Sequence, residues 1–77
     1  MVQIDMVISG EIWGIHINED SSKEGCNVLD NEIWANGDRE EIRESLKMSF
    51  RYLVANERQH LIPGVVDRIM KVVGMRV

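Results

Sequence analysis

His16 and Asp5 are the two residues whose types and placement come nearest to catalytic chemistry. Apolar and polar residues alternate over residues 2–17, and a hairpin with its two-residue loop at Gly10-Glu11 would place His16 opposite Asp5. A carboxylate beside an imidazole is half of a general-base dyad. Catalysis also requires a pocket, which a solvent-exposed sheet face does not provide. We therefore interpret the pair as an ordinary exposed cross-strand contact.

No other combination of residues has the spacing of a catalytic or ligand-binding motif. Cys26 lies in a polar loop without a neighbouring histidine to activate it, and His60 is distant from His16 in the sequence. The chain lacks paired His or Cys ligands at metal-binding spacing, a glycine-rich phosphate loop and a serine nucleophile elbow. We expect a protein that is not an enzyme, with no catalytic residue, metal, cofactor or small-molecule substrate.

Charge is unevenly distributed along the sequence. The chain of 77 residues has a net charge of −4, to which residues 1–37 contribute −6 and residues 38–77 contribute +2. An acidic surface repels the phosphates of nucleic acids and attracts basic proteins. The acidic loop residues Glu19, Asp20 and Glu24 are therefore candidates for contact with a protein partner, although a solvated loop is the simpler interpretation.

Four basic residues spaced four apart form the sharpest feature of the second half of the chain. On a helix this spacing places all of them on one face, which we call the basic stripe: Arg39, Arg43, Lys47 and Arg51. Glu40 and Glu44 are spaced to pair with them, so a solvated face is the simplest interpretation. Protein binding is the second interpretation, and binding of nucleic acid ranks last.

The elements that would position these residues begin with a β-hairpin. One face of the hairpin collects the apolar side chains Val2, Ile4, Met6, Ile8, Trp13, Ile15 and Ile17. A loop at Ser9-Gly10 instead of Gly10-Glu11 would keep the same face, so the face does not depend on the register. A polar loop over 18–27 then leads to a third strand over 28–35. In that strand Ile33 and Trp34 must point to opposite faces, which leaves Trp34 either under a loop or in an interface.

Two amphipathic helices complete the predicted fold. Asp38 followed by Glu41 has the spacing of a capping box, and apolar residues at three-and-four spacing predict a helix from Arg39 to Gln59 or His60. A helix of that length would extend past so small a domain, so it either ends near residues 55–56 or packs on another subunit. Pro63-Gly64 separates it from a second helix that Gly74 ends.

Size and cysteine content bear on partners and location. A domain of this length rarely obtains more than about 3–5 kcal/mol from one core, and a single cysteine cannot form an internal disulfide. We therefore expect a protein partner or a homodimer, because Trp34, Tyr52, Val66 and Met70 are left over from the core. The dimer contact would use residues 52–61 or the edge of the third strand near Trp34. The sequence shows no export signal and no membrane span, so we expect a cytoplasmic protein.

The sequence thus predicts one α+β domain over residues 1–77, with a small antiparallel sheet of two to three strands and a single layer of two helices on one sheet face. The function that fits best is a non-catalytic protein–protein interaction module, a small acidic inhibitor or adaptor of the kind that phages and mobile elements encode against host machinery. The alternative is a nucleic-acid-associated regulator that uses the basic stripe.

Overall fold

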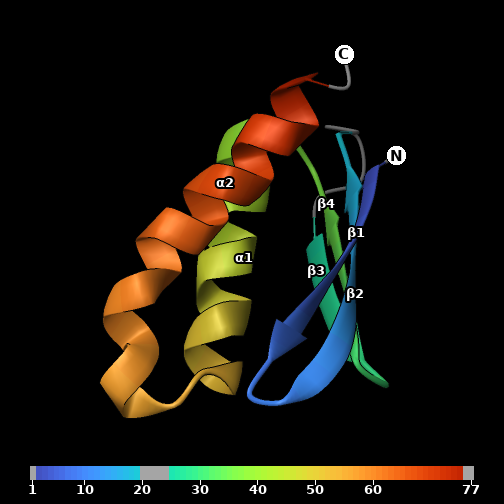
Figure 1. Cartoon of the computed structure of the whole chain (residues 1–77). Helices are drawn as coiled ribbons and strands as arrows, with labels where there is room; N and C mark the ends of the chain where they lie inside the picture. The colour runs from blue at the N-terminus through green and yellow to red at the C-terminus, as the bar shows by residue number, and fades with distance from the viewer. Residues whose placement is uncertain (1, 20–24, 76–77) are drawn as a thin grey trace.

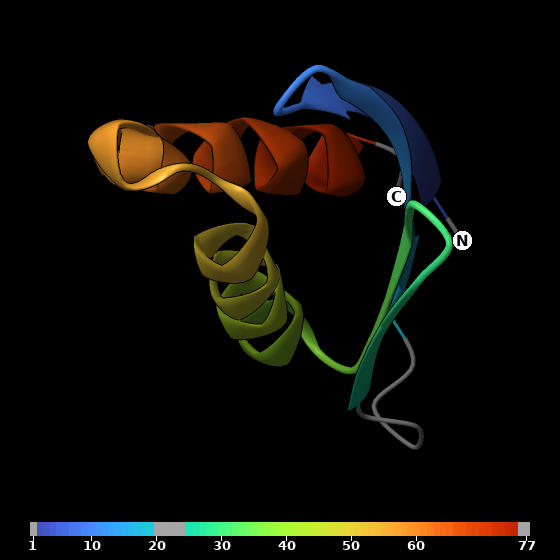
Figure 2. The ribbon, with the colours of Figure 1, turned by 90° about the horizontal axis from the view of Figure 1, so that it is seen from below.

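Four strands are followed by two α-helices in the computed structural model, which describes residues 2–19 and 25–75 (Figure 1). The elements in chain order are β1 (Val2–Ile8), β2 (Glu11–Asn18), β3 (Gly25–Leu29), β4 (Glu32–Asn36), α1 (Arg39–Leu53), the 3-10 helix η1 (Asn56–Leu61) and α2 (Ile62–Met75). Both α-helices lie on the same face of the sheet, and no helix of the described residues lies on the opposite face (Figures 1 and 2). The predicted α+β class and the single helix layer are confirmed.

The sheet joins two hairpins through a central parallel pair, in the order β1-β2-β4-β3. β1 pairs antiparallel with β2, β3 pairs antiparallel with β4, and β2 and β4 run parallel. Two backbone hydrogen bonds close the ends of the parallel pair, from Gly14 N–H to the Asn31 carbonyl (3.0 Å) and from Gly37 N–H to the Asn18 carbonyl (3.2 Å). The prediction of an antiparallel sheet of two to three strands was wrong, because the sheet is mixed and has four strands.

The first hairpin turns at Ser9-Gly10. Ser9 and Gly10 both have positive φ angles, 51° and 84°, as a type I′ turn requires. Ile4 therefore pairs with Ile15, a shift of two residues from the register with a Gly10-Glu11 loop. A shift of two keeps every side chain on its face, so the predicted apolar face is confirmed although the preferred register was wrong.

The second hairpin replaces the predicted third strand. Asp30 and Asn31 have φ angles of 51° and 59°, so the chain reverses between Leu29 and Glu32 within the stretch that was predicted to be continuous. Asparagine and aspartate tolerate this left-handed conformation better than other non-glycine residues. The two adjacent turn-forming residues in the middle of an apolar stretch were the signal for this turn.

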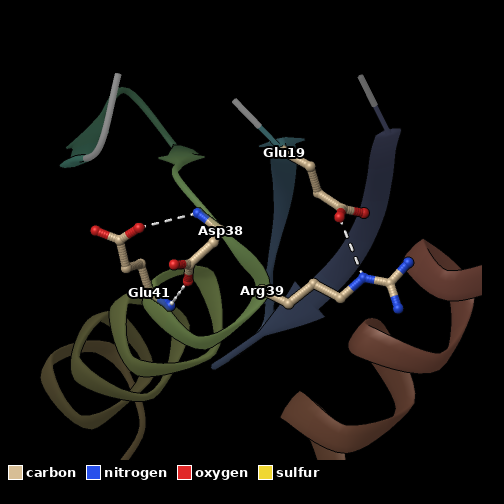
Figure 3. Close-up of polar contacts among 4 residues, drawn as sticks. All are labelled: Glu19, Asp38, Arg39 and Glu41. Carbon is tan, nitrogen blue, oxygen red and sulfur yellow. Dashed lines mark hydrogen bonds and ion pairs between the residues drawn. The ribbon is translucent and has the colours of Figure 1, made fainter. Parts of the chain in front are cut away.

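α1 begins with the predicted capping box. The Asp38 carboxylate accepts a hydrogen bond from Glu41 N–H (2.9 Å), and the Glu41 carboxylate accepts one from Asp38 N–H (3.0 Å) (Figure 3). The helix ends at Leu53, and the chain continues as η1 from Asn56. The predicted end at Gln59 or His60 was wrong, and the expectation that it ends near residues 55–56 was closer. The long-helix argument for a dimer therefore no longer applies.

The core lies between the helix layer and the sheet. Its fully buried large side chains come from both layers: Ile15, Ile17, Ile33, Ile42, Leu46, Phe50, Val66 and Val73. Val2, Ile4, Met6, Trp13 and Leu53 are partly buried against them, as the hairpin pattern predicted. Val66 and Met70 are buried, so the expectation that they remain outside the core was wrong. No helix of the described residues is long and apolar enough to cross a membrane.

Candidate interaction surfaces

His16 pairs with a different carboxylate from the one that the preferred hairpin register predicted. Its Nε2 lies 2.8 Å from Glu32 Oε1, and its ring stacks on Trp34 with centroids 3.8 Å apart and planes 5° from parallel. His16 sits opposite Gln3, and its side chain is only 8% exposed. The prediction of an exposed His16–Asp5 pair was therefore wrong. The parallel register of β2 and β4 places His16 beside Trp34, and the stack buries the imidazole.

The helix-free face of the sheet presents four exposed apolar side chains. We call this the outer face, and its apolar members are Val7, Ile12, Leu29 and Trp34, which are 37–71% exposed. Trp34 points away from the core while its neighbour Ile33 is fully buried, as the adjacent pair predicted. Trp34 is held by the His16 ring and is not covered as a core residue would be. Such rigid, half-exposed tryptophans are typical of protein interfaces.

The ionisable groups on the strands of the outer face are acidic, apart from His16. Asp5 and Glu32 lie on this face on either side of Gly14, in the row that joins β1, β2 and β4. A Cβ atom at Gly14 would lie 3.6 Å from both Asp5 Oδ1 and His16 Nε2, so the glycine leaves a shallow gap between these polar groups. The four described strands contain no lysine or arginine. The outer face is therefore apolar at several points and negatively charged between them.

The basic stripe lies on α1, and three of its members are paired. Arg39 Nε donates to Glu19 Oε2 (3.1 Å), as Figure 3 shows, and Arg43 Nη1 donates to Asp67 of α2. Lys47 lies 4.0 Å from Glu44. Within the described residues Arg51 has no ion pair. These acidic partners neutralise most of the stripe, which favours its interpretation as a solvated face.

A groove separates the β3 edge of the sheet from α1. It has a volume of about 470 Å³, and its lining includes Val28, Met48, Leu53 and the predicted interface residue Tyr52. Tyr52 is 93% exposed and Met48 68% exposed. The Cys26 thiol lies 3.2 Å from Ser49 Oγ and links β3 to α1, so this cysteine is engaged within the fold.

Of the three predicted acidic loop residues, the structure describes only Glu19. Glu19 faces Arg39 and is not part of the outer face, while Asp20 and Glu24 lie outside the described residues. Within residues 2–19 and 25–75 no three His, Cys, Asp or Glu side chains gather closely enough to hold a metal ion.

The outer-face residues Val7, Ile12 and Leu29, and the groove residues Val28 and Met48, were not predicted as interaction residues. Period-two alternation is broken where Val7 precedes Ile8 and Ile12 precedes Trp13, and these adjacent apolar pairs were the available signal. In each pair one side chain must leave the core face, as Ile33 and Trp34 already implied.

Comparison with known proteins finds no family model, curated protein or solved structure that matches the chain.

Proposed function

We propose that this chain is a non-catalytic protein-interaction module whose outer face binds a basic surface of another protein. The observation that carries the proposal is the composition of that face, where Val7, Ile12, Leu29 and Trp34 are exposed around acidic residues and the strands contribute no basic residue. A partner that covers this sheet face would bury all four apolar side chains, including the rigid Trp34, and remove their apolar area from water.

The two components of the outer face would make different contributions to binding. The apolar side chains supply most of the affinity, because each removes apolar area from water on binding. Asp5 and Glu32 supply selectivity and faster association with a basic partner. An inhibitor or adaptor role follows from this design, since a small acidic module can cover a basic surface of a larger protein. A phage or mobile-element origin and a cytoplasmic location are part of the same proposal.

The test uses a cationic probe peptide of alternating leucine and lysine, followed by amide NMR signals of the labelled protein. We expect the shifts to change at β2 and β4, around Ile12 and Trp34, and to vanish in the double variant Ile12→Lys, Leu29→Lys. The matched control is Val72→Lys, an exposed valine on α2 that is 38% exposed. Binding that survives the double variant, or that Val72→Lys abolishes, contradicts the proposal.

The nucleic-acid alternative makes a different prediction for the same samples. A regulator that used the basic stripe would bind random-sequence DNA, and its affinity would fall steeply as salt is added. Arg51→Glu, at the stripe residue without an ion pair among the described residues, would weaken that binding most directly. We expect no measurable DNA binding at physiological salt, because the stripe is neutralised and the sheet is acidic.

A further inference from the structure

Among the described residues, the β3 edge and the side of α1 next to it form a continuous surface without charge. β3 has the sequence Gly-Cys-Asn-Val-Leu, and all five residues are exposed. The side of α1 that borders the same groove contributes Ser45, Met48, Ser49 and Tyr52. In a chain with 29% charged residues, a strand without charge beside an uncharged side of a helix stands out. Interface centres are depleted of charge in this way.

The backbone of β3 offers hydrogen bonds at this surface. The hairpin closes with a two-residue loop, so the Leu29–Glu32 pair next to it is hydrogen-bonded. Alternation then directs the N–H and C=O groups of Asn27 toward β4, and those of Cys26 and Val28 toward the open edge. None of the described residues pairs with that edge. An uncharged edge strand of this kind is a template for another strand.

The distribution of charge favours β3 over β1 as the strand through which two copies could pair. Two copies of a chain with a net charge of −4 repel each other, and the acidic outer faces cannot meet. The other edge strand, β1, contains Asp5, so two copies of β1 would bring like charges together. The β3 and α1 surface lets two copies approach without opposing like charges.

We propose that two copies of this chain pair through β3, antiparallel about a two-fold axis, and form one continuous eight-stranded sheet. Full overlap of the five-residue strand places Asn27 opposite Asn27 of the partner subunit. Cys26 and Val28 then exchange backbone hydrogen bonds with Val28 and Cys26 of the partner subunit. The strand is only about 17 Å long, so the contact also needs the α1 side chains. Met48 and Tyr52 cover the junction from each subunit.

Dimerisation would bury apolar side chains that the isolated domain leaves exposed. Val28, Met48 and Tyr52, all at least 40% exposed in the monomer, become buried in both copies. The contact uses the backbone edge of β3 and the helix side of the sheet, so the outer-face side chains, that of Leu29 in β3 included, stay exposed on both subunits. Dimerisation therefore adds to the proposed function without depending on it, and the two can fail separately.

Sedimentation equilibrium from micromolar to millimolar concentration tests the surface. We expect a reversible dimer, weakened at least about tenfold, or about 1.4 kcal/mol, by Tyr52→Lys. Tyr52 is 93% exposed, so this change leaves the fold intact, which circular dichroism verifies. The matched control is Val7→Lys at the β1 edge, which should leave the dimer unchanged. A monomer at millimolar concentration, a dimer that Tyr52→Lys leaves intact, or a dimer that Val7→Lys disrupts overturns the proposal.

Cross-linking tests the strand pairing. In a Cys26→Ser background, Asn27→Cys places two thiols opposite each other at a non-hydrogen-bonded pair, with Cα atoms about 4.5 Å apart. That separation is within the range for a disulfide, about 4.4–6.8 Å. Mild oxidation with oxidised glutathione should yield a covalent dimer, whereas Val7→Cys in the same background should yield none. Absence of the Asn27→Cys cross-link overturns the antiparallel pairing of β3.

Discussion

The two edge strands of the sheet, β1 and β3, belong to the same kind of hairpin but differ in how far their residues are exposed to solvent. β1 has seven residues in which partly buried and exposed side chains alternate, and Ile4 and Met6 on its inner face line a groove of about 220 Å³ together with Val65 and Ile69 of α2. β3 has five residues, all of them exposed, and the groove beside it is open. In Figure 2, α2 lies next to the blue β1–β2 hairpin and α1 next to the green β3–β4 hairpin.

We call β1 the closed edge, because its inner side chains join the core, and β3 the open edge, and this difference does not come from the hairpins. Both turns use two residues with positive φ angles, so the turns cannot account for it. β1 also carries Asp5 at a position whose backbone groups point away from β2, and a charge there discourages pairing with another strand. β3 carries no charge, although α1 lies over its inner face, where Cys26 Sγ is 3.2 Å from Ser49 Oγ.

The largest expected effect is a loss of unfolding free energy on proline substitution in β3. The loss should depend on whether the substituted N–H points toward β4 or toward the open edge. Asn27→Pro removes an N–H that points to β4 and should cost about 3 kcal/mol of unfolding free energy. Val28→Pro removes an N–H that points to the open edge, and should cost clearly less, because proline is tolerated at edge positions. Urea denaturation at low protein concentration, where the chain is monomeric, measures both. Equal losses would show that the register of β3 is wrong.

The second prediction compares one inward side chain from each edge. Ile4→Ala should lower the free energy of unfolding by about 2 kcal/mol, because Ile4 is partly buried beside α2. Val28→Ala should cost less than about 1 kcal/mol in the monomer, because Val28 is 40% exposed. Thermal and urea unfolding of the two variants provide the test. A larger loss for Val28→Ala would mean that β3, and not β1, is the closed edge.

The smallest expected effect concerns the turn of the closed edge. Ser9 is a left-handed residue with a φ of 51°, and its Oγ donates to the Leu53 carbonyl (3.1 Å). Ser9→Asn creates the Asn-Gly pair that type I′ turns prefer and should stabilise the fold by about 0.5 kcal/mol. Ser9→Ala should destabilise it by about 1 kcal/mol, because alanine loses the hydrogen bond and tolerates positive φ poorly. A rise in melting temperature for Ser9→Asn together with a fall for Ser9→Ala would confirm the turn type. Changes in the same direction for both variants would contradict it.

Local patterns predicted the local elements. The alternation over residues 2–17 identified the apolar face, and Asp38 with Glu41 identified the start of α1, because both signals depend only on neighbouring residues. The four-residue spacing likewise placed the basic stripe on one helix face. The early end of α1 was predicted only as an alternative, from the size of the domain, because the sequence pattern continues to favour helix beyond Leu53, where the chain instead turns into η1.

Features that depend on residues far apart in the chain could not be predicted from local sequence patterns. No residue of β2 or β4 specifies that these strands should lie side by side and parallel, so the neighbour of Trp34 could not be known. The stack with His16 follows from that register alone. The groove beside β3 was missed for the same reason, because it exists only where α1 lies over a strand that the sequence pattern had merged with β4.

The parallel pairing of β2 with β4 also has a consequence for the folding kinetics. Each hairpin joins strands that are adjacent in the chain, so each can form on the microsecond timescale of local contacts. Docking of one hairpin on the other requires closure of the segment between β2 and β4, and is the most non-local step in the sheet. We expect Gly14 and Ile33, at the junction, to have low φ-values relative to the two turns if the hairpins form first. The rate-limiting step of folding is then the docking of the preformed β1–β2 hairpin on the preformed β3–β4 hairpin.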